Sequence, residues 1–276
     1  MSRSRRAWDQ AWKLALAAVI ILPLYALPLL YLVGVSFQTP SQFLRDPLSL
    51  PHPFTPGNYP TAWVEGDFGQ YFINSVIYTA SATLMSVLFA VFIAFPIARR
   101  YVRGGSVIYS LFLAGFFLPI SIVPLFIEAE KLGLYNTQWG YILLHLQLGL
   151  TLGVLFFVGY FNNIPKELDE SAQLDGCGYF RYVTQILIPL STPALVTVAI
   201  YSAVATWNDL IGPVVFLATN SYFPLTRGLF SFYGQYESDW TLLAAGVLIV
   251  AMPLILAFGF IQRYLVRGAT AGALKL

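Results

Sequence analysis

Long apolar runs separated by short polar connections are the dominant pattern along this chain. A helix needs roughly 20 residues to cross the hydrocarbon of a bilayer, and six runs are near that length. They fall at residues 14–37, 72–98, 107–126, 139–161, 192–217 and 242–261. Prolines lie within or beside several runs, which membrane helices tolerate when neighbouring groups satisfy the freed carbonyls. The pattern predicts an all-α integral membrane protein with six transmembrane helices.

Composition supports this class and excludes others. The 276 residues are 58% hydrophobic and 10% charged, and the mean hydropathy is +0.69. Soluble domains carry about 25% charged residues, so a water-soluble enzyme and a disordered chain are both excluded. The single cysteine, Cys177, rules out an intrachain disulfide, and the two histidines lie far apart in the sequence. We therefore expect no metal site on this chain.

The positions of the basic residues predict an orientation. Twelve of the 15 Lys and Arg residues fall in the two termini and in the connections after the second and fourth runs. The other three, Arg45, Lys131 and Arg227, fall in the remaining connections. Because cytoplasmic segments are enriched in Lys and Arg, we expect both termini in the cytoplasm. An even number of spans is what that orientation requires.

This topology divides the chain into five expected parts. A cytoplasmic N-terminus (1–13) precedes the first transmembrane helix (14–37), and a Pro-rich extracytoplasmic loop (38–71) follows it. A core of five further transmembrane helices (72–262) precedes a cytoplasmic tail (263–276). Within the core, the connection at about 162–190, which we call the elbow, is predicted to lie on the cytoplasmic side.

The elbow contains more structure-forming signals than a linker needs. Pro165 can open a helix, and acidic residues, which the helix dipole favours in a first turn, follow it: Glu167, Asp169 and Glu170. Gly176 then permits a sharp change of direction. A second helical stretch is expected to have one apolar face, formed by Phe180, Val183 and Leu187. A helix lying in lipid headgroups and a docking surface for a cytoplasmic partner both agree with this pattern.

The elbow also resembles a known motif. Glu170-Ser171-Ala172, with Gly176 four residues later and Pro189 at the end of an Ile-x-Ile-Pro stretch, resembles the EAA loop of permease subunits of binding-protein-dependent ABC importers. Ser171 and Ile188 replace the usual alanine and leucine, which are small changes in volume. Three further stretches resemble carbohydrate importers, and in particular the six-helix second membrane component of the maltose importer: Asn58-Tyr59, residues 207–210 and the tail at 264–275.

The resemblance implies an ABC type I importer permease core with a cytoplasmic coupling helix in the EAA loop. It implies a heterodimer with a second permease subunit, two copies of an ABC ATPase, an extracytoplasmic sugar-binding protein, and a place in a bacterial-type inner membrane. The ATPase-coupling residues that it implies are Glu170, Ser171, Ala172, Asp175, Gly176, Ile186 and Pro189. Ordinary cap or turn roles for Glu170 and Asp175 stay open beside this interpretation.

We expect no catalytic residue and no cofactor on this chain. The sequence has no phosphate-cradling G-x-x-x-x-G-K-[ST] loop, so ATP and Mg²⁺ are expected on the partner ATPase. An ion- or proton-coupled secondary transporter, the main alternative, would need repeated halves and several intramembrane charges. A membrane enzyme would need paired carboxylates, a His with a nucleophile, or metal ligands within the membrane, and the sequence predicts no such group.

Asp209 is the only acidic residue within a predicted span. A carboxylate in the membrane is costly unless it faces partners or water. Together with Trp207 and Asn208 it forms a candidate substrate path, in which these side chains would contact sugar hydroxyls and ring faces. In the alternative interpretation, Asn208 and Asp209 cap a broken helix ahead of Gly212 or bridge to the partner subunit. His145 is expected to be a helix-packing donor.

Overall fold

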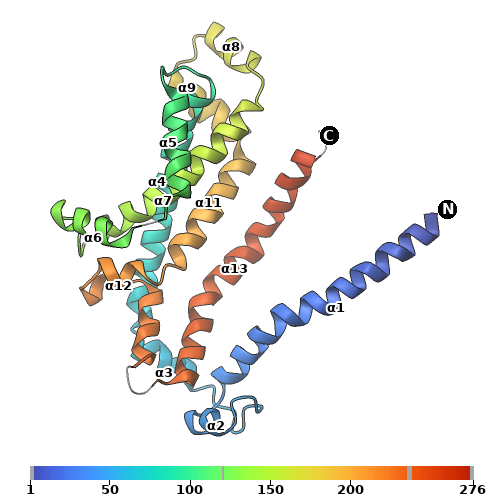
Figure 1. Cartoon of the computed structure of the whole chain (residues 1–276), viewed down its shortest axis with the longest axis vertical. Helices are drawn as coiled ribbons and strands as arrows, with labels where there is room; N and C mark the ends of the chain where they lie inside the picture. The colour runs from blue at the N-terminus through green and yellow to red at the C-terminus, as the bar shows by residue number, and fades with distance from the viewer. Residues whose placement is uncertain (1–2, 120, 235–237, 274–276) are drawn as a thin grey trace. The chain divides into compact units, whose positions relative to one another are not determined.

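Helices form nearly all of the regular structure in the computed structural model, which describes residues 3–119, 121–234 and 238–273 (Figure 1). Side chains before Leu22, other than Trp12 and Val19, and after Phe260 are not described. Within the described ranges, strand pairing is limited to one isolated bridge, between Tyr233 and Ser238. The prediction of an all-α protein is confirmed.

The helices follow one another along the whole chain with short connections. In order they are α1 (Arg3–Ser36), α2 (Pro40–Arg45), α3 (Asn58–Glu65), α4 (Phe68–Ala98), α5 (Gly105–Phe117), α6 (Ile122–Lys131), α7 (Gln138–Asn162), α8 (Glu167–Leu174), α9 (Tyr179–Tyr182), a π-helical turn (Val183–Leu187), α10 (Ile188–Leu190), α11 (Thr192–Trp207), α12 (Gly212–Phe216), two 3₁₀ helices (Asn220–Tyr222 and Leu225–Phe232) and α13 (Trp240–Ala273).

Three of the described helices are long and apolar enough to cross a membrane: α4, α7 and the Trp240–Phe260 part of α13. The number rises to five if each of two sharply bent helix pairs is one span. The described apolar part of α1, Leu22–Ser36, is shorter than those three helices. The chain is thus a multi-pass membrane protein by its helices, and the count of six spans stays a prediction.

The expectation of one continuous helix at 107–126 is wrong. The axes of α5 and α6 differ by 116°. Leu118, the residue after α5, has extended backbone angles (φ −74°, ψ 134°). It precedes Pro119, and a proline disfavours helical angles in the residue before it. The apolar run therefore continues past a point at which the helix ends.

The run at 192–217 is also broken. Helix α11 ends at Trp207, and the short helix α12 begins at Gly212. Asp209 lies in the break, and its Oδ1 accepts a hydrogen bond of 2.9 Å from the Gly212 N–H. The bond satisfies one of the N–H groups that the first turn of a helix leaves without a partner in the helix.

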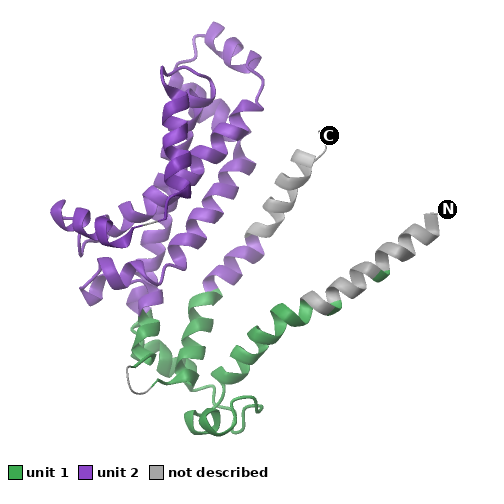
Figure 2. Ribbon diagram, in the orientation of Figure 1, with its two compact units in different colours: residues 1–68, 228–252 green, residues 69–227, 253–276 purple. Residues whose placement is uncertain are grey.

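Two compact units divide the chain (Figure 2). The first comprises residues 1–68 and 228–252. Its core surrounds the fully buried ring of Phe68, which has Trp63 and Phe232 at ring-centroid distances of 6.4 and 6.2 Å. After α1, the chain is held by Asn58, whose side-chain amide donates to the carbonyls of Ser36 (2.9 Å) and Gln38 (2.8 Å). These bonds give the connection between α1 and α3 a defined fold.

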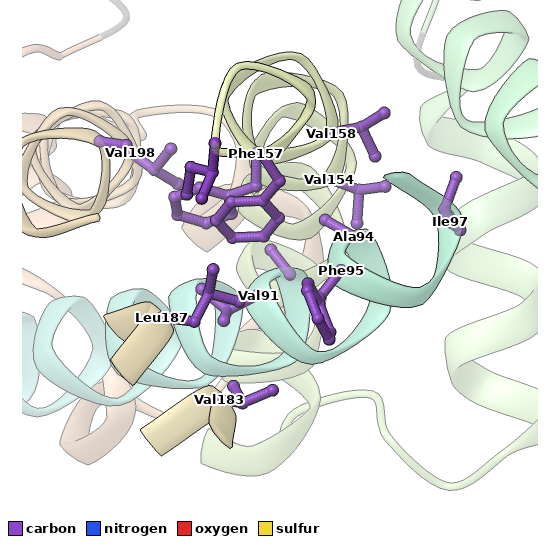
Figure 3. Packing of buried hydrophobic residues seen from close by; sticks show 14 of the residues in the cluster. Val91, Ala94, Phe95, Ile97, Val154, Phe157, Val158, Val183, Leu187 and Val198 are labelled. Atoms are coloured by element: carbon purple, nitrogen blue, oxygen red, sulfur yellow. The ribbon is translucent and has the colours of Figure 1, made fainter. Parts of the chain in front are cut away.

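The second unit, residues 69–227 and 253–276, contains the principal apolar core. Helix α7 packs against both α5 and α11. Figure 3 shows the buried cluster, to which α4, α7, α11 and the elbow all contribute. Phe157 of α7 is fully buried in this cluster, as is Leu187 of the elbow, which lies next to Val91 of α4. The elbow is therefore packed into the core of this unit through its second half.

Candidate functional site

The first half of the elbow is a short helix with a well-defined end. Helix α8 has Glu167, Asp169 and Glu170 in its first turn, as the sequence predicts. At its other end Gly176 has a left-handed φ of +71°, the Cys177 N–H donates to the Ala172 carbonyl (2.9 Å), and the Gly176 N–H donates to the Gln173 carbonyl (3.0 Å). This pair of bonds is the Schellman motif, in which glycine is the usual left-handed residue. The predicted change of direction at Gly176 is confirmed.

The second half of the elbow enters the core through a wide turn. After α9, the Ile188 N–H donates to the Val183 carbonyl five residues back, as in a π-helix. Val183 and Leu187 are buried in the core cluster, as the sequence predicts. Phe180 is 72% exposed, so the expectation that it shares their face is wrong. Phe180 lies before the π turn, in the short helix α9, and its ring contacts Phe92 and Tyr179 outside the buried part of the cluster.

A buried ion pair joins α8 to the rest of the second unit. The guanidinium of Arg99, which follows α4, pairs with the carboxylate of Asp169 on α8, and the two residues are 7% and 4% exposed. Arg99 Nη2 donates to Asp169 Oδ1 (3.2 Å), and Nη1 donates to the carbonyl of Phe161 near the end of α7 (3.0 Å). The hydroxyl of Tyr182 on α9 donates to the same Asp169 oxygen. One pair of charges thus connects α4, α7, α8 and α9.

Aromatic rings surround this ion pair. The rings of Phe95 and Tyr182 stack at 5.3 Å, and the Arg99 guanidinium lies 5.9 Å from the Phe95 ring centroid. Tyr101 packs edge-on against Phe95 at 5.8 Å. Partial burial, and then the Asp169 carboxylate, raise the pKa of the Tyr101 hydroxyl above its usual value. The negative charge that Arg99 faces in this aromatic group is the carboxylate of Asp169.

The ion pair is the main attachment of α8 within the described structure. Asp169 and Ala172 are the buried residues of α8. Burying one methyl group contributes about 0.8 kcal/mol, which is too little to fix the orientation of a helix. Removing one partner of a buried ion pair costs about 3–5 kcal/mol, because the other charge is left buried and unpaired. Breaking the pair by removing one partner is therefore expected to disturb the position of α8 more than truncating its small apolar contact.

The coupling residues expected from the resemblance occupy both sides of the elbow. Ala172 faces the core and Ile186 packs partly against it. The other members are exposed: Glu170, Ser171, Asp175, Gly176 and Pro189. The hydroxyl of Ser171 donates to the Glu167 carbonyl one turn back (2.7 Å), so this position adds no new contact beyond α8.

The residues expected to form a substrate path lie at the break between α11 and α12. Trp207 is buried, with its ring edge-on to Phe72 at 6.0 Å, and Asn208 is exposed. Asp209 caps α12 and also binds two side chains of α7. Its Oδ2 accepts a hydrogen bond from the Tyr141 hydroxyl (2.9 Å) and lies 3.1 Å from His145 Nε2.

These contacts give Asp209 a structural role in joining three segments. Besides the contacts to α7 and α12, its backbone carbonyl accepts a hydrogen bond from the Thr226 hydroxyl (2.7 Å). Asp209 and His145 also line a cavity of about 260 Å³ with mainly apolar walls. The hydrogen bond from Gly212 to Asp209 agrees with the alternative interpretation, in which Asp209 caps a broken helix. Asp209 and His145 also give this cavity a polar edge.

Comparison with known proteins identifies the family of the chain. Residues 86–270, which include the elbow and the α11–α12 break, match the family described as binding-protein-dependent transport system inner membrane component. The chain belongs to this family. This permease is 35% identical over 252 residues to the probable ABC transporter permease protein YurM of Bacillus subtilis, with 91% of this chain and 84% of YurM covered.

Further relatives are sugar transport permeases by name. The diacetylchitobiose uptake system permease protein NgcG of Streptomyces coelicolor is 29% identical and covers 100% of this permease, and 93% of NgcG is covered. A chain in the crystal structure of a bacterial ABC transporter that imports the acidic polysaccharide alginate shares the fold. Its TM-score is 0.78 at 21% identity, with 96% of this permease and 98% of that chain covered.

The sequence prediction for this permease missed Asp169, Arg99 and Tyr182 as a group. In the sequence, Asp169 is one of several acids that favour a helix start, and Arg99 is one of the basic residues that predict the orientation. The two residues are 70 positions apart, and neither has an unusual local pattern. One signal was available, because Asp169 precedes buried Ala172 by three residues and hence shares its helix face, whereas Glu170 does not.

Proposed function

We propose that this permease is the transmembrane subunit of an ATP-driven importer that moves a carbohydrate delivered by an extracytoplasmic binding protein. The observation that supports this most directly is the elbow. Helix α8 leaves the core with a fixed direction and carries at its end Leu174, which is 90% exposed. An apolar side chain beside exposed carboxylates fits a docking surface for a partner protein. The names of NgcG and other relatives support a carbohydrate as the substrate.

The partner on the elbow is proposed to be an ABC ATPase, present in two copies, which binds ATP and Mg²⁺ and performs the hydrolysis. The permease is then a non-catalytic subunit and pairs with a second permease subunit. In this arrangement Glu170 faces a basic group of the ATPase, and Asp175 together with Gly176 fixes the angle of the elbow. Ala172 and Gly176 keep the elbow compact, and Ile186 and Pro189 continue it into the core.

The orientation belongs to the same proposal. Six spans with both termini in the cytoplasm put the elbow on the side of ATP and the 38–71 loop on the side of the binding protein. The permease core is residues 72–262, preceded by the first helix at 14–37, and the 1–13 and 263–276 ends lie in the cytoplasm of a cell with a bacterial-type inner membrane. The end of the tail, 274–276, is outside the described residues.

The sugar path is proposed to pass the break between α11 and α12. Asn208, which is exposed, and Asp209, which lines the cavity, offer polar atoms for the sugar hydroxyls. The buried ring of Trp207 packs edge-on against Phe72 and supports the wall of the path. The contacts of Asp209 to Tyr141 and His145 hold its carboxylate in one position. A fixed acceptor at the wall of a cavity suits recognition of a hydroxyl group.

Co-purification and uptake test the proposed function. The permease, expressed with its neighbouring genes and extracted in mild detergent, is expected to bring down an ATPase and a second permease. In proteoliposomes that contain the complex, ATP supplied on the cytoplasmic side should drive sugar uptake only when the binding protein is present on the opposite side. A single-chain preparation that takes up sugar with a proton or sodium gradient and no ATP would contradict the proposal.

A further inference from the structure

We propose that the Arg99–Asp169 ion pair is the joint through which movement of α8 reaches the transmembrane helices α4 and α7. This inference rests on the proposed function, because it requires an ATPase that moves α8. Arg99 and Asp169 are then positioning residues, and neither one touches ATP or sugar. The role goes beyond the exposed coupling residues, which would meet the ATPase but do not hold α8 to the core.

The contacts of Arg99 fit a joint between several elements. A guanidinium presents five N–H donors in a rigid planar fork, so one side chain can hold two acceptors at fixed angles. Here the acceptors are the carboxylate of Asp169 on α8 and the carbonyl of Phe161 on α7. Arg99 itself directly follows α4. A tilt of α8 therefore acts on the ends of two long helices at once.

The aromatic group makes the joint stiff. Tyr182 donates to Asp169 from the other arm of the elbow, and its ring stacks on Phe95 of α4. Because Asp169 is 4% exposed, water does not compete for these hydrogen bonds. The two arms of the elbow and the end of α4 thus share one buried carboxylate.

Helix α7 can carry the movement to the candidate substrate path. It is continuous from Gln138 to Asn162 and has no internal proline. Phe161, near one end, accepts the hydrogen bond from Arg99, and Tyr141 and His145, near the other end, contact Asp209. At a rise of 1.5 Å per residue, about 30 Å separates Tyr141 from Phe161. Helix α7 therefore contacts Arg99 near one end and Asp209 near the other, so a movement of the helix at the joint also moves the residues that hold Asp209.

A test must separate a joint from a pair that serves stability alone. Asp169→Asn keeps the shape of the side chain and leaves Arg99 buried without a countercharge. The double variant Arg99→Met with Asp169→Asn leaves no unpaired charge, so it is the variant expected to fold and assemble. Arg103→Met is the matched control, because Arg103 lies in the same connection and is exposed. All are made in the complete complex and reconstituted with the binding protein.

The measurements are complex assembly, ATP hydrolysis with and without loaded binding protein, and sugar uptake. A joint predicts that the double variant assembles and hydrolyses ATP, that hydrolysis depends less on the binding protein, and that uptake per ATP falls about tenfold, within the usual range of coupling between sites. Arg103→Met should match the wild type. Uptake per ATP at the wild-type level in the double variant would overturn the inference, as would failure of that variant to assemble, since the pair would then serve stability. A wild-type complex without ATP-driven uptake would instead contradict the proposed function.

Discussion

Gly149 shows how little space separates α7 from its neighbours. A Cβ atom added there would lie 2.5 Å from Ser86 Oγ on α4 and 2.6 Å from Ser202 Oγ on α11. Both serines are buried, so neither side chain has an open direction in which to move. Overpacking of a core costs about 1–3 kcal/mol. We expect Gly149→Ala to lower the midpoint of thermal unfolding in detergent.

Gly159 on the same helix provides the control for this prediction. A Cβ atom added there meets no heavy atom within 4 Å. Alanine is favoured over glycine within a helix by about 1 kcal/mol, so Gly159→Ala should leave the midpoint unchanged or raise it. Equal midpoints for the two variants would show that α4, α7 and α11 do not pack as closely as Gly149 implies.

At the scale of elements, the agreement between sequence and structure depends on what determines each helix. The runs at 72–98 and 139–161 lie within α4 and α7, because long apolar stretches bounded by polar residues leave few alternatives in a membrane. The breaks were harder to predict. Proline is common in membrane helices, and nothing local distinguishes Pro119, beside which the helix ends, from Pro96, which lies within α4.

The elbow was predictable in part for the same reason. Its Schellman turn depends on residues within one short stretch, and Gly176 marks it in the sequence. Its attachment to the core depends on Arg99, which lies 70 residues before Asp169. A single sequence gives no direct sign of a contact at that separation. Local signals thus predicted the shape of the elbow, and only the folded chain showed what holds it.

At Gly176, the effect of a substitution should depend on how well the new residue adopts a left-handed backbone angle, and not on the size of its side chain. A Cβ atom there meets nothing within 4 Å, but the φ of +71° costs a residue other than glycine about 1–2 kcal/mol. We expect Gly176→Val, which adds a branched side chain, to reduce sugar uptake strongly by misdirecting α8. Gly176→Asn should retain more uptake, because asparagine tolerates left-handed angles better. Uptake by the reconstituted complex provides the measurement.

Gly178 tests whether this effect is specific to the turn. It lies two residues further along, has ordinary extended angles (φ −73°, ψ 163°), and has open space around its Cα. Gly178→Ala should therefore transport like the wild type. If Gly176→Val transported equally well, the direction of α8 would not depend on the Schellman turn.

For the whole molecule, the arrangement of charge is the link between fold and proposed function. A net charge of +2 conceals the concentration of basic residues near the expected cytoplasmic ends of the spans. Arg99 belongs to that set, yet it is buried and paired with Asp169. Orientation and attachment of the elbow thus depend on the same short connection after α4.

Labelling with a membrane-impermeant maleimide tests the orientation of the whole chain. Three exposed positions serve as single cysteines in a Cys177→Ala background: Leu48→Cys, Arg103→Cys and Leu174→Cys. Twelve of 15 basic residues on one side predict that position 48 faces outward and the other two face the cytoplasm. Position 48 should then react in intact spheroplasts, and positions 103 and 174 only after permeabilisation.

The same cysteine at position 174 also tests the docking surface. Leu174 is 90% exposed in the permease chain itself, so position 174 should become protected from the maleimide when the ATPase is co-expressed. Labelling of position 103 in intact spheroplasts would show that the topology is the reverse of the one proposed. The elbow would then lie on the side without ATP, and the proposed coupling to an ATPase would be contradicted.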